Sequence, residues 1–324
     1  MKDGGWVKGK LVGYGSFGTV HLAMNKSTGR VFVVKSPHSK AGPEALDEEV
    51  KILKTLNSSP YIVQCLGTEE EEQGKVNVFM EYMAGGSLAD VARKFGGSLE
   101  EEVVRVYTRE ILLGLKHLHQ QGIVHCDVKC RNVLLGSSGN IKLADFGCAK
   151  RVKMGESTCT IGFGGTPLWM APEVLRNESL DFAADIWSLG CTVIEMATGT
   201  PPWAHHVFPN PISALLQIAH GDALPHFPPH FSKDGLAFLS RCLHRQPSKR
   251  STAHQLLSHP FVSPQTSSPP SVFQFPSFKD YHLDVSEPNH FSFPSHQDAH
   301  GPVCNKCEDT AFGSSGNWIN VRSH

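Results

Sequence analysis

Up to about Met80, short apolar runs alternate with glycine and polar residues, a pattern typical of β-strands. Strands are predicted at residues 10–12, 20–23, 30–35, 62–66 and 76–82. Between the third and fourth strands the apolar residues repeat at helical spacing, which predicts one helix over 44–56 with a stripe of Leu46, Val50, Leu53 and Leu56. The acidic run 69–72 is predicted to be a solvated hairpin loop. This part of the chain is therefore expected to be rich in strands.

After Gly85 and Gly86 the apolar positions take the period of helices. Ser98 and Glu101 match a capping box, and the apolar face that follows predicts a long helix that stops near Gly122. Further helices are predicted at 184–199, 236–243 and 253–257. A β-rich lobe thus precedes an α-rich lobe. We predict an α+β domain over 1–262, with a first lobe at about 1–80, a connection at about 81–86 and a second lobe at about 87–262.

From about Ser263 the chain is rich in proline, serine, histidine and phenylalanine and poor in aliphatic residues. Segment 263–324 is therefore predicted to be a largely disordered tail. Its phenylalanines are unusual for a linker, and we expect them to dock on the domain or on a regulatory protein: Phe273, Phe275, Phe278, Phe291 and Phe293. The single CxxC motif at 304–307 lacks the second pair that a zinc site needs, so no metal is predicted there.

Charge and composition limit the expected partners and compartment. Lys+Arg number 30 against 31 for Asp+Glu, so no basic surplus favours nucleic acid or an anionic membrane. No apolar run approaches the ~20 residues of a membrane helix, and the first residues lack the pattern of a secretory signal. The 9 cysteines, an odd number, are expected to be reduced thiols. We expect an intracellular protein, in the cytoplasm, the nucleus or both.

Residues 13–20 match the pattern G-x-G-x-x-G-x-V. Glycines let the backbone turn tightly and bring its N–H groups close to phosphate oxygens. A lone match of this kind is as consistent with a simple hairpin turn. Here a strand follows instead of a helix, which disfavours a dinucleotide-binding fold. The predicted nucleotide-binding residues of this region are Val12, Gly13, Gly15, Gly18 and Val20.

Lys35 ends an apolar, strand-like run. A lysine there could snorkel to water at the sheet edge. The functional interpretation is a cation on the α- and β-phosphates of a nucleotide, held by a carboxylate of the helix over 44–56. Glu49 is the favoured partner because it lies beside the apolar stripe, and Glu48 is the alternative.

Two further motifs carry the residues expected of a phosphoryl-transfer site. In the run His-Cys-Asp-Val-Lys-Cys-Arg-Asn at 125–132, Asp127 is the predicted base and Lys129 would offset charge on the γ-phosphate. Asn132 would bind a metal ion through its amide oxygen. Asp145, in Asp-Phe-Gly at 145–147, supplies the hard carboxylate ligand that Mg²⁺ prefers. Four such residues at this spacing predict an enzyme that uses ATP and Mg²⁺.

Over about residues 10–262 these motifs resemble those of the eukaryotic protein kinases. Lys129 resembles the serine/threonine kinases, and the run 165–174 (GTPLWMAPEV) resembles the MAP kinase kinase kinase and Ste20-related branch. The run 81–88 (EYMAGGSL) and His125-Cys126-Asp127 are most similar to plant MEKK-like kinases. The resemblance implies a bilobal kinase that transfers the ATP γ-phosphate to serine or threonine of MAP kinase kinases. Two alternatives are a non-catalytic scaffold with a kinase fold and a Ste20-like kinase one tier higher.

The same resemblance implies roles for residues that the pattern alone does not single out. Met80 would be the gatekeeper, and Glu81 and Met83 would offer backbone groups to adenine. Thr166 would shape the acceptor site beside Asp127. It also implies that Glu173 and Arg250 form a buried ion pair that braces the second lobe. Asp185 would anchor the backbone of the catalytic loop.

Cys126 departs from the family pattern, which usually has arginine there. That arginine pairs with a phosphate on the activation loop, a contact that cysteine cannot make. We therefore hypothesise that activity depends less on phosphorylation of this loop, although it offers Ser157, Thr158 and Thr160 as sites. A reactive thiol is a second interpretation of Cys126.

Overall fold

The computed structural model describes residues 5–14, 18–37, 42–56, 59–70, 76–152 and 164–263. Residues Met1–Thr266 form one compact unit. The tail beyond residue 263 and its CxxC motif lie outside the described residues, so the disorder of 263–324 stays a prediction. The lobe boundaries also stay predictions. Within the described ranges, no helix has the length and apolar character needed to cross a membrane.

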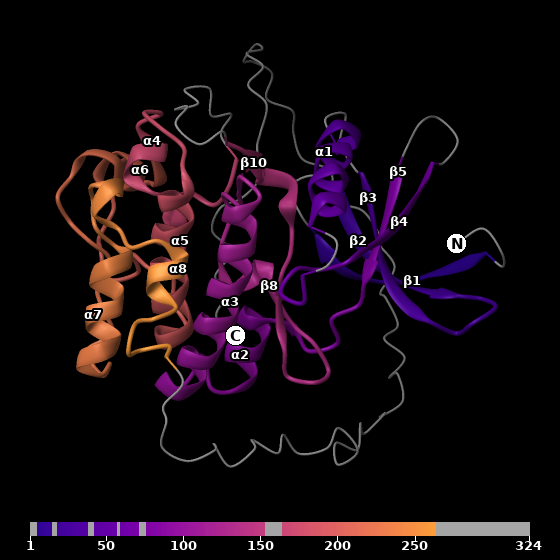
Figure 1. The fold of residues 1–324 in the computed structure, drawn as a ribbon, viewed down its shortest axis with the longest axis horizontal. Coiled ribbons are helices and arrows are strands. Elements are labelled where there is room, and N and C mark those ends of the chain that lie inside the picture. Colours follow the sequence, from indigo (N-terminus) through magenta and orange to yellow (C-terminus); the bar gives the residue numbers. More distant parts are fainter. Residues whose placement is uncertain are drawn as a thin grey trace, which may run out of the picture. The chain divides into compact units, whose positions relative to one another are not determined.

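The first part of the chain folds into an antiparallel sheet of five strands. The strands are β1 (Trp6–Tyr14), β2 (Gly18–Asn25), β3 (Val31–Pro37), β4 (Cys65–Glu70) and β5 (Val76–Glu81). Their order in the sheet is β1-β2-β3-β5-β4. Helix α1 (Gly42–Thr55) packs on β3, β4 and β5 and lies beside the sheet in Figure 1. The predicted β-rich lobe with one main helix is therefore observed.

Alternation along β3 sends its side chains to two different cores. Phe32 and Val34 pack with Phe79 in a small cluster, where the rings of Phe32 and Phe79 meet edge to face at 5.5 Å. Val33 belongs to the large core that also contains the apolar stripe of α1. Lys35 follows in the same alternation as Val33 and is only 3% exposed. The pleat of one strand thus directs a lysine inward.

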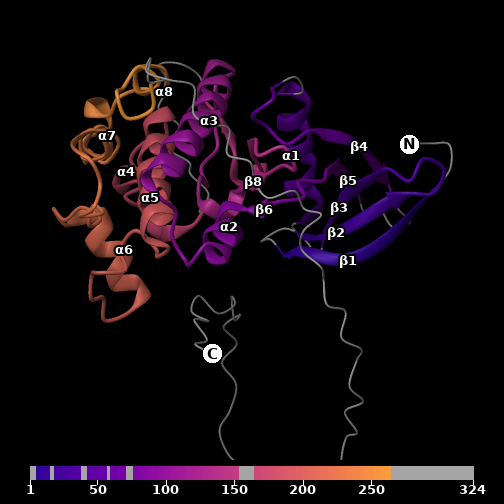
Figure 2. The same ribbon diagram turned by 90° about the horizontal axis from the view of Figure 1, so that it is seen from below.

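The second part is largely helical. Its helices are α2 (Leu88–Lys94), α3 (Glu101–Gln120), α4 (Pro172–Leu175), α5 (Phe182–Thr198), α6 (Pro211–His220), α7 (Lys233–Cys242) and α8 (Ala253–Leu256). Helix α5 packs on both α3 and α7, and most of its residues are buried, with Trp187 fully enclosed. Figures 1 and 2 both show α5 beside α3. Helix α5 is thus the core of this lobe.

Short strands hold the loops that carry the predicted chemistry. Strands β6 (Gly86–Ser87), β8 (Val133–Leu135) and β9 (Ile141–Leu143) form one small sheet, and β7 (Ile123–Val124) pairs with β10 (Lys150–Arg151). The loop 125–132 joins β7 to β8, and Asp145 follows β9 closely. Single 3₁₀ turns complete the described elements: Cys130–Asn132, Phe146–Cys148, Pro167–Trp169 and Pro247–Lys249.

Two local predictions are wrong. Glu69 and Glu70 belong to β4 instead of a loop, and the exposed Glu69 accepts a hydrogen bond from the indole of Trp6 at 2.8 Å. The predicted capping box is not formed, because the N-cap of α3 is Glu100, two residues after Ser98. The Glu101 carboxylate instead accepts hydrogen bonds from the backbone N–H and hydroxyl of Ser232, at 2.8 and 2.5 Å. Helices α2, α4 and α6 have no counterpart among the predicted helices.

We expect Gly199→Ala to lower the free energy of unfolding more than Gly29→Ala does. Both glycines have left-handed φ, 67° and 68°, so each substitution incurs ~1–2 kcal/mol of backbone strain. A Cβ at Gly199 would also lie 1.9 Å from the carbonyl oxygen of Gly97, whereas nothing lies within 4 Å at Gly29. The clash adds ~1–3 kcal/mol. Urea unfolding of both variants measures the difference, and equal losses would contradict this account.

Candidate active site

Lys35 forms two ion pairs in the interior of the domain. Its Nζ lies 2.7 Å from Oε2 of Glu49 on α1 and 2.7 Å from Oδ1 of Asp145. Glu48, the alternative partner, is exposed and instead binds Lys51 at 2.7 Å. Lys35 therefore does not snorkel to water, and it joins the sheet, the helix and the segment after β9.

The charges of this triad shift one another's pKa values. Burial alone would lower the pKa of Lys35, but Glu49 and Asp145 outweigh it and raise that pKa above its ordinary value. Burial raises the pKa of the enclosed Glu49, and Lys35 only partly offsets this rise. Burial also tends to raise the pKa of Asp145, but there the charge of Lys35 prevails and the pKa is lowered. One cation thus faces two carboxylates, and the ionised form is favoured more in Asp145.

Asp127 lies at the centre of a second hydrogen-bonded group. Lys129 Nζ donates to Oδ2 of Asp127 at 2.8 Å and to Oγ1 of Thr166 at 2.5 Å. The hydroxyl of Thr166 donates to Oδ1 of Asp127 at 2.6 Å. Asn132 Nδ2 donates to both the carbonyl and Oδ2 of Asp127, each at 2.8 Å. Hydrogen bonds to both carboxylate oxygens therefore fix the orientation of the Asp127 side chain.

The two groups are joined through the backbone next to Asp145. The N–H of Ala144 donates to the carbonyl of Asn132 at 2.9 Å. Asp145 itself has φ of 63°, an unusual value for a residue with a side chain. Its carboxylate is 36% exposed, whereas that of Glu49 is buried. The structure thus brings Lys35, Glu49, Asp127, Lys129, Asn132, Asp145 and Thr166 into one connected site.

Asp185 anchors the backbone of the 125–132 loop from α5. Its Oδ1 accepts the N–H of Cys126 and its Oδ2 accepts the N–H of His125, both at 2.9 Å. Oδ2 also lies 2.9 Å from Nε2 of His119 on α3. Cys126 has φ of 66°, so these bonds hold a strained turn in place.

The thiol of Cys126 is not activated. Burial raises its pKa well above the ordinary value, and the carboxylate of Asp185 raises it further. Its Sγ donates to the carbonyl of Val124 at 3.6 Å. The group is therefore a protonated thiol at neutral pH, which argues against the interpretation of a reactive cysteine. The loop residues Ser157, Thr158 and Thr160 lie outside the described residues.

Part of the glycine-rich segment is described. Gly13 in β1 pairs with Val20 in β2, and Val12 is 43% exposed. A Cβ at Gly18 would lie 2.5 Å from the carbonyl oxygen of Ser36, so this position has no room for a side chain. Gly15 lies outside the described residues.

The end of β5 and the residues just after it carry the three residues that the resemblance assigns to adenine binding. Met80 and Met83 are both buried. The side chain of Glu81 is committed elsewhere, because it accepts hydrogen bonds from Lys142 Nζ at 2.6 Å and from the backbone N–H of Gln64 at 2.7 Å. Any contact of Glu81 with a nucleotide would therefore involve its backbone.

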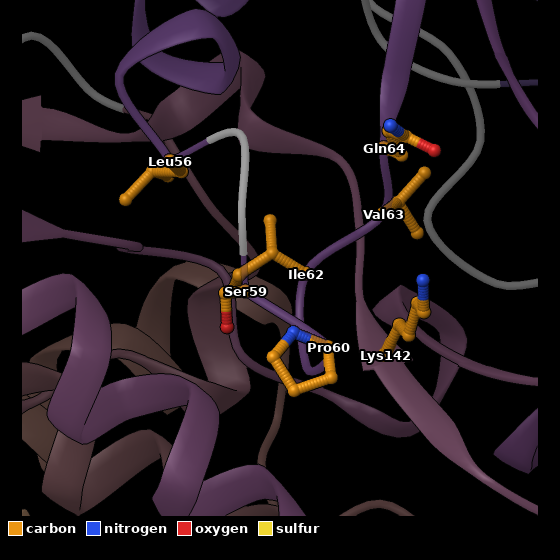
Figure 3. A pocket seen from close by; sticks show the side chains of 7 residues that line it. All are labelled: Leu56, Ser59, Pro60, Ile62, Val63, Gln64 and Lys142. Carbon is orange, nitrogen blue, oxygen red and sulfur yellow. The ribbon is translucent and has the colours of Figure 1, made fainter.

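Gln64 and Lys142 also line a pocket of about 260 Å³ beyond the end of α1, shown in Figure 3. Its other lining residues come from the segment between α1 and β4 and include Pro60 and Val63. None of the residues predicted to bind nucleotide, metal or acceptor lines it. This pocket is therefore separate from the candidate active site.

A second buried ion pair lies in the helical lobe. The guanidinium of Arg250 donates to both carboxylate oxygens of Glu173, at 2.6 and 2.7 Å. It also donates to the carbonyl of Ala183 at 2.8 Å and lies 5.1 Å from the ring centre of Trp187. The pair connects the segment before α8 with α4 and α5.

Two contributors to the site were not found from the sequence. His119 contacts Asp185, as described above. Glu195 on α5 accepts the N–H of Cys130 at 3.0 Å and the indole N–H of Trp169 at 3.1 Å. Both residues lie on predicted helices, but a helical pattern does not show which polar side chain meets a distant loop.

Known proteins resemble this chain over most of its length. The family model of the protein kinase domain matches residues 6–262. Mitogen-activated protein kinase kinase kinase 3 of Arabidopsis thaliana is 42% identical over 275 residues, which cover 82% of this chain. Mitogen-activated protein kinase kinase kinase 18 of the same plant is 41% identical over 300 residues, which cover 87% of each chain. The chain belongs to the protein kinase domain family.

The relatives differ in length. The matched region covers 42% of the length of mitogen-activated protein kinase kinase kinase 3. It covers 41% of the length of mitogen-activated protein kinase kinase kinase 2, also from Arabidopsis thaliana. The chain thus spans about two fifths of the length of these relatives. The family membership and the fold concern the kinase domain itself.

We expect Arg250→Met to lower the free energy of unfolding by ~3–5 kcal/mol, because it leaves the carboxylate of Glu173 buried without its partner. Replacing both residues, with Glu173→Met added, removes the unpaired charge. The double variant should therefore recover much of the loss. Urea unfolding of the two variants tests this, and a double variant less stable than Arg250→Met would contradict it.

Proposed function

We propose that this chain is a serine/threonine protein kinase that transfers the γ-phosphate of ATP to a protein, and that it acts as a MAP kinase kinase kinase. One observation carries the proposal. Two hydrogen-bonded groups, around Lys35 and around Asp127, meet at the backbone contact between Ala144 and Asn132. Phosphoryl transfer by a kinase needs a cation on the phosphates beside an acid that orients the acceptor. Lys35 and Asp127 are placed to supply these two groups.

The available oxygen donors fit Mg²⁺. Among the described residues, Oδ2 of Asp145 and Oδ1 of Asn132 accept no hydrogen bond, since Lys35 binds Oδ1 of Asp145 and Asn132 donates through Nδ2. Mg²⁺ prefers such hard oxygen ligands and takes the rest from water and phosphates. Two protein oxygens are therefore enough for this site. The described ranges contain no cluster of three or more histidine, cysteine, aspartate or glutamate side chains that could hold a metal ion. Bound Mg²⁺ would neutralise charge on the transferred phosphate.

The remaining groups have complementary tasks. Lys35, fixed by Glu49, holds the α- and β-phosphates under the glycine-rich segment. Asp127 orients the acceptor hydroxyl and accepts its proton, and Lys129 offsets charge on the γ-phosphate. Thr166, bonded to both, shapes the acceptor side. Most of the rate enhancement then comes from positioning and charge.

The acceptor class rests on Lys129 and on the relatives. Lys129 contacts both Asp127 and Thr166, which supports a serine or threonine acceptor. The names of the relatives support MAP kinase kinases as substrates. A non-catalytic scaffold and a Ste20-like kinase one tier higher are the competing functions. We also propose an intracellular setting, cytoplasmic or nuclear, which the six free cysteines of the described ranges support. Cell fractionation tests the setting.

The purified chain should phosphorylate kinase-inactive MAP kinase kinases on serine or threonine, as measured by radiolabel transfer with mapped sites. Asp145→Asn should lower the rate by about 100-fold or more, because it removes the charged metal ligand. Glu49→Gln should lower it by roughly tenfold or more, since Lys35 loses a partner. The neighbouring Glu48→Gln, whose exposed side chain pairs with Lys51, should change it less than about twofold.

Different failures identify different competitors. Absence of any Mg·ATP-dependent transfer would favour the scaffold. Transfer to other kinases but not to MAP kinase kinases would favour the higher tier. Equal losses in Glu49→Gln and Glu48→Gln would contradict the proposed phosphate clamp.

The unmodified chain should keep most of its activity, within about twofold, after phosphatase treatment. Cys126 has no cationic group to pair with a phosphate on the activation loop. Cys126→Arg should make activity depend on phosphorylation, and Cys126→Ala serves as the control without the charge. The measurement is the initial rate before and after dephosphorylation. A large loss in the unmodified chain would refute the hypothesis.

A further inference from the structure

A cavity of about 370 Å³ lies in the helical lobe, where the end of α3, the start of α5 and the start of α8 meet. Figures 1 and 2 show α8 next to α3. The lining contains none of the residues proposed to bind nucleotide, metal or acceptor. Its volume falls in the range of pockets that bind small molecules.

All ionisable side chains that line this cavity are basic. They are Lys116, His119, Arg250 and His254. Arg250 is already neutralised by Glu173. In the described part of the chain, neither Lys116 nor His254 has an ion-pair partner. The nearby carboxylate of Asp181 accepts the N–H of Ala183 at 2.7 Å as the cap of α5.

The lining also includes an apolar and aromatic wall. The ring of Phe182 lies against the imidazole of His119, with centroids 4.8 Å apart and planes tilted by 32°. Ile186, at 1% exposure, and Ala253, at 2%, complete this wall. Basic groups without counter-charges therefore adjoin an apolar surface.

We infer that this cavity binds a small amphipathic carboxylate, an anion that carries an aromatic or aliphatic group. Its carboxylate pairs with Lys116 and accepts a hydrogen bond from His254. Its apolar part packs against the ring of Phe182. A neutral analogue would lose the charge contact, and a plain inorganic anion would lose the apolar contact.

A bound carboxylate would lie beside His119, which contacts the anchor of the 125–132 loop. His119 forms part of the wall and lies 2.9 Å from Asp185, whose two oxygens hold the N–H groups of His125 and Cys126. The ligand thus lies one side chain away from that anchor. The inference goes beyond the proposed kinase function, and its test by binding does not depend on kinase activity.

The experiment is a ligand-detected NMR titration of the full chain with 2-naphthoate as the probe and the uncharged 2-naphthamide as the matched ligand. We expect saturable binding of naphthoate with Kd on the order of 1 mM or tighter. Lys116→Gln should weaken naphthoate about three- to tenfold and leave naphthamide unchanged. Lys94→Gln, near the end of α2 and away from the lining, is the matched control and should have no effect.

Three outcomes would overturn the inference. These are no saturable binding at millimolar naphthoate, equal affinity for the acid and the amide, or equal effects of Lys116→Gln and Lys94→Gln. If Lys116→Gln does not fold, His254→Gln takes its place, because His254 is exposed and its loss should also weaken naphthoate selectively.

Discussion

The ammonium group of Lys35 is the charge on which the geometry of the site depends. Transfer of such a group from water to the interior is costly unless it is paired. Its two partners come from a helix and from a segment more than a hundred residues later, Glu49 and Asp145. Displacing either carboxylate leaves the buried ammonium group with a single partner and removes one of the two links that it makes. The sheet, α1 and the backbone next to Asn132 are therefore held in register by electrostatics as well as by packing.

Much of the fold could be predicted because periodicity reports burial directly. The β-rich first lobe, the helix with Leu46 and Leu53 and the long α3 follow from it. The errors lie where distant contacts override a local pattern. Glu101 does not form the predicted capping box, because its carboxylate accepts a hydrogen bond from Ser232, which lies far along the chain. Helices α2 and α6, of 7 and 10 residues, were not predicted, although α7, also of 10 residues, was.

The candidate site shows the same division. Residue types and spacing were enough to select Lys35, Asp127 and Asp145, since lysine at the end of an apolar run and clustered polar residues are uncommon. Spacing could not decide between Glu48 and Glu49, because one residue of helix register separates an exposed side chain from a buried one. The contact between His119 and Asp185 bridges two helices and has no signature along the chain.

The anchoring of the 125–132 loop by Asp185 has an evolutionary consequence. Its carboxylate binds the amides of His125 and Cys126, and every residue except proline carries such an amide. The shape of the turn is thus insulated from the identity of the side chain at 126. A lineage could exchange arginine for cysteine there and rewire its upstream control while the loop kept its form.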